Sequence, residues 1–147
     1  MEPRVTLVTF GVTDLAASRR FYVDGLGWTP TLEVPDTVVF LQVGHGLLLG
    51  LFPVAELDAD AGGGTTSDPA RSAFSLAHNV GSDGEVDAVI ADARAAGATV
   101  LKEPQRAAWG GYHAYFADPS GFRWEVAHNA GLRVAADGTV VMGPVEA

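Results

Sequence analysis

Hydrophobic and polar positions divide the first third of the chain into a strand, a helix and three further strands. Residues 5–12, VTLVTFGV, are rich in β-branched and aromatic side chains and predict a strand. Thr13 or Asp14 can then cap a helix that continues to about Val23, where glycines follow. The next three expected strands span residues 28–34, 37–43 and 47–52. The predicted order of elements is therefore βαβββ.

The same order returns in the second half of the chain. Ser82 and Glu85 have the spacing of a capping box, which predicts a helix that Gly97 ends. The expected strands of this half span residues 73–80, 99–103, 112–117 and 122–127. The chain thus repeats one βαβββ unit with a period of roughly 70 residues, in pattern more than in identity.

These patterns divide the 147 residues into four parts of a single domain. The parts are a first module at about 4–53, a linker at about 54–72, a second module at about 73–128 and a tail at 129–147. The linker is expected to be a mobile surface connection, because three successive glycines and a cluster of Ser, Thr, Asp and Pro interrupt the periodic pattern. An Asp137-Gly138 turn in the tail indicates an added hairpin.

Each predicted module has one amphipathic helix, which can cover only one face of its four-stranded sheet. The other face then needs cover from the twin module. The sequence therefore predicts an α+β fold in which two sheets enclose a concave cup, lined by strand residues that point away from the helices.

Composition narrows the classes of protein. Hydrophobic residues make up 48% and charged residues 18% of the chain, as in a folded globule. A formal charge of −9 with nine Lys and Arg disfavours nucleic acid as a partner. We expect a cytoplasmic protein with no membrane span, because no apolar run is long enough and the first residues do not resemble a signal peptide. Without cysteine, a metal would depend on His, Asp and Glu.

Two phrases carry a family resemblance. VTDLAASRRFYVDGLGW at residues 12–28 and YFADPSGFRWEV at residues 115–126 resemble the module signatures of the vicinal oxygen chelate superfamily, which includes glyoxalases, bleomycin-resistance proteins and extradiol dioxygenases. With the repeat, the likeness covers residues 4–128. The resemblance implies paired βαβββ modules around a cup, in which the enzymes of the family hold a divalent metal ion.

The resemblance places the four metal-ligand positions on the first and last strand of each module. In this chain they are Leu7, Gly50, Ser75 and Glu125. Only Glu125 is a plausible ligand, and moving the first strand by one residue offers only Thr6 or Val8. An enzymatic metal site needs about three protein ligands. We therefore expect no cofactor, and a divalent metal is disfavoured.

The face of the strand that follows Gly111 depends on the turn at residues 118–121. If that turn carries a glycine bulge, Tyr115 lies opposite Glu125 and His113 shares their face. Similarity to the fosfomycin-resistance proteins supports this register and adds Thr9, two residues after the first ligand position. Without the bulge, the residues that face the cup are Tyr112, Ala114 and Phe116. We favour His113 and Tyr115.

The other aromatic and histidine residues have different expected positions. Trp109 can stack on a flat ligand or close the rim of the cup, and Phe52 can line the mouth of the first module or only touch the rim. Trp28 is expected in the core and His78 on the helix side of its strand. The expected ligand-binding residues are Leu7, Thr9, Phe52, Ser75, Trp109, His113, Tyr115 and Glu125.

The leading functional hypothesis is a small-molecule binder that uses no metal. Its ligand would be a hydrophobic or aromatic metabolite, or an antibiotic as in bleomycin resistance. The alternative is an enzyme of the same superfamily, a lyase, isomerase or dioxygenase. Such an enzyme would depend on a metal or use Glu125 as base with Tyr115 or His113 as acid. A structural or protein-interaction role ranks third.

The resemblance also implies a homodimer. Some members of the superfamily exchange modules between chains, so that one cup contains residues from both. The glycines at residues 62–64 of the linker would permit such an exchange.

Overall fold

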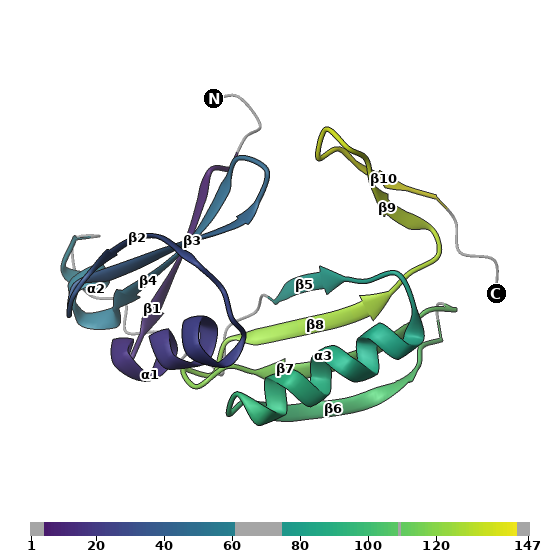
Figure 1. Ribbon diagram of the computed structural model, residues 1–147, viewed down its shortest axis with the longest axis horizontal. Coiled ribbons are helices and arrows are strands. Elements are labelled where there is room, and N and C mark those ends of the chain that lie inside the picture. The colour runs from purple at the N-terminus through teal and green to yellow at the C-terminus, as the bar shows by residue number, and fades with distance from the viewer. Residues whose placement is uncertain (1–4, 61–74, 109, 144–147) are drawn as a thin grey trace.

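The computed structural model describes residues 5–60, 75–108 and 110–143, which form two mixed sheets with their helices and a C-terminal hairpin (Figure 1). The elements of the first module are β1 (Leu7–Val12), α1 (Leu15–Arg19), the π-helical segment η1 (Arg20–Gly25), β2 (Pro30–Val34), β3 (Val38–Gly44), β4 (Leu47–Pro53) and α2 (Val54–Asp60). Those that follow are β5 (Leu76–Asn79), α3 (Asp83–Ala95), β6 (Thr99–Arg106), β7 (Tyr112–Ala117), β8 (Arg123–His128), β9 (Leu132–Val134) and β10 (Val140–Met142).

The two sheets have the same topology. The first has the strand order β1-β4-β3-β2 and the second the order β5-β8-β7-β6. In each, the first strand of the module pairs in parallel with the last strand, and the other neighbours are antiparallel. The predicted α+β fold of two βαβββ modules is therefore confirmed.

Local signals set where the helices begin and end. Asp14 caps α1 by accepting a hydrogen bond from the amide of Ala17. Ser82 caps α3 by accepting from the amide of Glu85, whose carboxylate accepts from the amide of Gly81. Beyond the end of α3, Gly97 has a φ of 102°, a conformation that glycine adopts without strain.

The expected linker is not all irregular. Residues 54–60 form α2, and the rest of the linker, including the glycines at residues 62–64, lies outside the described residues. This helix packs on the first sheet, because a side chain at Gly11 would come within 3.1–3.2 Å of Leu57 and Val54. Two apolar residues three apart in a run of helix-forming residues explain the difference from the prediction.

The tail forms the expected hairpin, with β9 and β10 antiparallel. At its tip, Gly138 lies against the turn between β3 and β4, since a Cβ at Gly138 would be 3.0 Å from the Cβ of His45. The hairpin thus rises from the end of the second module (Figure 1), and its tip reaches the first module at His45.

The two modules share one hydrophobic core, to which the helix-bearing faces of both sheets contribute. Phe10 of β1 stacks on Phe122, with ring centroids 3.9 Å apart, and lies edge-on to Trp124 of β8. The Tyr22 hydroxyl donates to the Asp118 carboxylate and accepts from the Trp124 indole. We therefore expect the two modules to unfold as one unit.

The helical segments of the two modules also touch, and this close contact gives a test of the packing. A Cβ at Gly25 of η1 would lie 2.6 Å from the Cβ of Ala96. We expect Gly25→Ala to lower the free energy of unfolding by about 1–3 kcal/mol, because the added methyl forces the segments apart. Urea unfolding would measure it. Gly84→Ala is the control, since a methyl at this position in α3 meets nothing within 4 Å and should leave stability unchanged or raise it.

Candidate functional site

A glycine bulge fixes the face that β7 presents. The amide of Gly121 donates to the carbonyl of Asp118, and Gly121 has a φ of 92°, so the hydrogen-bonded turn over residues 118–121 ends in a left-handed glycine. As a result Tyr115 pairs directly with Glu125. The register predicted for a bulged turn is confirmed, and Tyr112, Ala114 and Phe116 lie on the helix side.

Four side chains meet on the outer face of the second sheet. His113 Nδ1 lies 2.9 Å from Glu125 Oε1, and His113 Nε2 lies 2.7 Å from Lys102 Nζ. An ammonium group can only donate, so Nε2 accepts from Lys102, and Nδ1 carries the proton that it donates to Glu125. The imidazole ring thus connects Lys102 to Glu125.

Tyr115 completes this group, which we call the outer-face cluster: Lys102, His113, Tyr115 and Glu125. The rings of His113 and Tyr115 meet edge to face, with centroids 5.6 Å apart. Burial, together with the hydrogen bond and charge of Glu125, raises the pKa of Tyr115 above its ordinary value of 10.0. The phenol therefore keeps its proton at neutral pH and can donate a hydrogen bond.

The cluster is accessible to a ligand, though unevenly. The side chain of Glu125 is 23% exposed and that of His113 only 9%. Tyr115 is half-buried. A ligand on this face would therefore meet the carboxylate and the phenol first, with the imidazole behind them.

The outer face of the first sheet is apolar. By strand alternation it includes Leu7, Thr9 and Phe52, which lie on the side of the sheet opposite the core. Leu7 is 40% exposed, and its side chain and that of Phe40 occupy the space over Gly50, where a Cβ would come within 3.2–3.3 Å of each. The hydrogen bonds and ring contacts of the outer-face cluster do not extend to Leu7, Thr9 or Phe52 among the described residues.

The donor set does not fit the divalent metal that the fold implies. Leucine and glycine supply no side-chain donor at the two positions of the first module, and Leu7 and Phe40 fill the space there. The fourth position, Glu125, is held by His113, whose other ring nitrogen contacts the ammonium of Lys102. In residues 5–60, 75–108 and 110–143, no three His, Cys, Asp or Glu side chains form a group that could hold a metal ion.

The remaining predicted residues differ in their positions. Ser75 is exposed and directly precedes β5. His78 pairs with Val126 on the helix side, as predicted, and Trp28 packs against the core. Trp109 lies outside the described residues. Lys102 is the member of the cluster that the sequence did not indicate.

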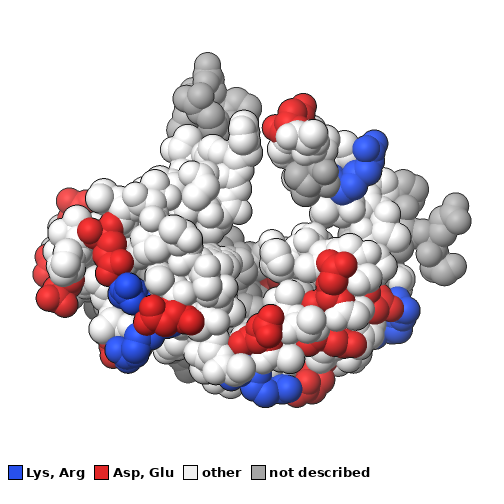
Figure 2. Space-filling view, in the orientation of Figure 1, with Lys and Arg blue, Asp and Glu red and all other residues white. Residues whose placement is uncertain are grey.

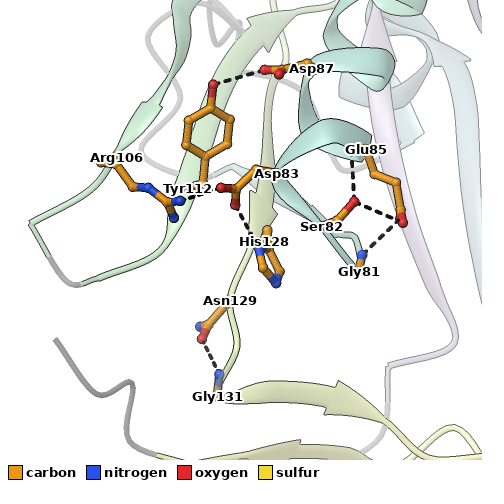
Figure 3. A network of polar contacts seen from close by, with 10 residues as sticks. All are labelled: Gly81, Ser82, Asp83, Glu85, Asp87, Arg106, Tyr112, His128, Asn129 and Gly131. Carbon is orange, nitrogen blue, oxygen red and sulfur yellow. Dashed lines mark hydrogen bonds and ion pairs between the residues drawn. The ribbon is translucent and has the colours of Figure 1, made fainter.

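A second polar network lies at the N-terminal end of α3 (Figure 3). Asp83 binds both Arg106 and His128, and the Tyr112 hydroxyl donates to Asp87. The Arg106 guanidinium also lies 5.4 Å from the centre of the Tyr112 ring. These contacts connect the ends of β6, β7 and β8 to the first turns of α3, so we assign the network a structural role.

In the described parts of the chain, no helix is long and apolar enough to cross a membrane.

The architecture has clear relatives among solved structures. A glyoxalase-related enzyme from Fulvimarina pelagi is 36% identical with a TM-score of 0.86, and the match covers 96% of this chain and 99% of that one. A glyoxalase/bleomycin resistance protein/dioxygenase from Nocardioides is 26% identical (TM-score 0.73; 87% and 84% covered). A lactoylglutathione lyase from Agrobacterium tumefaciens is also 26% identical (TM-score 0.63; 87% and 95% covered).

A comparison with curated proteins gives no match. The family model of the Glyoxalase/Bleomycin resistance protein/Dioxygenase superfamily matches residues 4–126, which include both modules and the outer-face cluster. With the fold and the relative at 36% identity, this match leads to one conclusion: the chain belongs to the Glyoxalase/Bleomycin resistance protein/Dioxygenase superfamily.

Proposed function

We propose that this protein binds a small hydrophobic or aromatic molecule, a metabolite or an antibiotic, in the cup of its superfamily and without a metal ion. The observation that carries the proposal is that the Glu125 carboxylate already has a hydrogen-bond partner within the protein. The carboxylate at the family's ligand position is engaged by His113, whose other ring nitrogen contacts Lys102, while Leu7 and Phe40 occupy the space over Gly50.

The chemistry of the two faces supports such a ligand. The first sheet offers apolar surface around Leu7, which favours an apolar body. The outer-face cluster offers a phenol donor, a carboxylate acceptor and an ammonium, which can orient the polar atoms of a ligand. An apolar wall with a few convergent polar groups is typical of small-molecule sites.

An enzyme of the same superfamily is the second candidate. The cluster connects four groups that can exchange protons, and it would allow Glu125 to act as base with Tyr115 or His113 as acid. In this arrangement Glu125 already accepts hydrogen bonds from its neighbours, which favours an anchoring role over abstraction of a substrate proton. Turnover that is lost in Glu125→Gln, with binding retained, would favour the enzyme.

We also propose that the working form is a homodimer. The outer face of the first sheet exposes Leu7, Leu32 and Val34, of which Leu32 is 53% exposed. A second copy that places its outer-face cluster against this apolar face would cover it and complete a cup. The chain mass is 15.3 kDa, and light scattering should find a species of twice that mass. A monomer at all concentrations would contradict the proposal.

The test of binding uses a library of aromatic metabolites and antibiotics, with and without EDTA. We expect saturable binding that EDTA does not change, and a loss of about tenfold or more in affinity in Glu125→Gln, because the anchor loses its charge. Titration calorimetry would measure both.

Glu103→Gln is the matched control for this test. Its carboxylate lies in the same sheet, but it is 67% exposed and pairs with Arg94. We expect it to bind the ligand as the wild type does. A bound metal ion at one equivalent per chain, found by elemental analysis of protein purified without chelator, would overturn the metal-free proposal.

A further inference from the structure

Two neighbouring clefts lie between the modules on the helix side, away from the outer-face cluster. One, of about 610 Å³, lies between η1 and α3, and the other, of about 420 Å³, lies between the first sheet and β5. Both are lined by Trp28, His78 and Trp124. We call this pair of clefts the helix-side groove, and Figure 2 shows that the molecule is hollowed between its modules.

The walls of the groove are aromatic and held in place. Trp28 and Trp124 meet edge to face, with centroids 5.8 Å apart, and Tyr22 packs against Trp28 at 5.3 Å. The Trp124 indole already donates to the Tyr22 hydroxyl, which fixes the ring and satisfies its N–H. Trp28 is only partly buried, so its ring is the aromatic surface that a ligand can reach, and the nearly buried Trp124 lies behind it.

The charges around the groove have one sign. The ionisable residues that line it are Asp24, His78 and Asp92, and its lining contains no Lys or Arg. Asp24 forms an ion pair with Arg19, which offsets its charge. Asp92 on α3 is exposed and is the carboxylate that can attract a ligand. Acidic side chains outnumber basic ones on the face shown in Figure 2, and the whole chain carries −9. The field at the groove therefore attracts cations.

From this lining we infer that the helix-side groove binds an organic cation with a compact apolar or aromatic body. Its volume lies in the range of small-molecule sites. Trp28, which is partly exposed, provides the cation–π contact. Trp124, which is only 7% exposed, adds apolar wall, and Asp92 provides the charge. On β8, Trp124 and Glu125 point to opposite faces, so this site is separate from the proposed cup.

The test uses phenyltrimethylammonium and its neutral isostere tert-butylbenzene at the same concentration. The indole N–H signals of Trp28 and Trp124 in NMR spectra, assigned with single Trp→Phe variants, report on the groove. We expect the cation to shift both signals saturably, with a Kd below about 1 mM, and the neutral isostere to bind at least about threefold more weakly. Benzoate should leave both signals unchanged.

Two variants separate charge from shape, and a third is the control. We expect Trp28→Leu to weaken binding of the cation at least about fivefold, and Asp92→Asn about threefold. Asp87→Asn removes the same charge from the same helix, outside the groove lining, and should bind as the wild type does. Equal binding of the neutral isostere, no saturable shift, or equal losses in both Asp variants would overturn the inference. Glu125→Gln should leave this binding intact, so the two proposals can fail independently.

Discussion

Replacing Asp118 by alanine is expected to lower the free energy of unfolding by about 3–4 kcal/mol. Asp118 is 4% exposed, and its carboxylate accepts hydrogen bonds from the Tyr22 hydroxyl and from the amides of Ser120 and Phe122. Alanine would leave these donors buried without an acceptor, and each such loss costs about 1–3 kcal/mol with partial overlap among neighbours. Urea unfolding followed by circular dichroism would measure the change.

Two further variants at this cluster separate the hydrogen bonds from the charge. Tyr22→Phe removes the hydroxyl that donates to Asp118 and accepts from the Trp124 indole, but keeps the two amide bonds of the turn, so it should cost less, about 2–3 kcal/mol. Asp118→Asn keeps an acceptor and removes the charge. A loss in Asp118→Ala no larger than in Tyr22→Phe would contradict the role given to the turn.

The Asp118 carboxylate should also make the stability of the protein fall as the pH rises. Burial raises the pKa of Asp118 above its ordinary value of 3.8, against its hydrogen bonds, which lower it. The folded protein therefore holds this proton more tightly than the unfolded chain. The contribution is fully present below pH 3.8 and is lost as the pH rises through the folded pKa. Relative to Asp118→Asn, the wild type should lose stability as the pH rises over that window.

The parts of this fold that were predictable are those that short sequence signals specify. The Ser82 and Glu85 spacing gave the start of α3, and Gly97 its end. At the site, the glycine at position 121 indicated a bulge, and the bulge alone determines that Tyr115 pairs with Glu125. A one-residue change in this turn would turn the whole strand over.

Lys102 could not be placed in the cluster by the same reasoning. Val100 pairs with Phe116 on the helix side, so plain alternation would also put Lys102 on that side. The register of β6 shifts between Val100 and Lys102, and the shift brings Lys102 opposite Tyr115, on the outer face. No glycine or turn sequence marks this irregularity. The contacts with β7, distant in sequence, are what reveal it.

Local sequence patterns also did not predict that the two modules share one core. Each module shows its own helix and strands in the sequence, but only the three-dimensional structure shows that Phe10 of the first module stacks on Phe122 of the second. Because this stacking joins segments more than one hundred residues apart, we expect the stability of each module to depend on the other.

Phe10→Ala should therefore destabilise the whole chain by about 3–5 kcal/mol, the range for removing a buried phenylalanine ring. Phe10 is fully buried, and its loss leaves a cavity next to Phe122 and Trp124. Because the ring belongs to both modules, we expect one unfolding transition at a lower urea concentration, with amide exchange accelerated equally in β3 and β7.

Phe40→Ala is the matched control for this variant. Phe40 lies in the same sheet but is only half-buried and is on the outer face, over Gly50. Its removal opens no cavity between the modules, so the loss should stay below about 2 kcal/mol. If Phe10→Ala accelerated exchange in β3 and left β7 protected, the modules would be separate folding units. The common core would then be a contact between two domains, and the helix-side groove would be free to open and close.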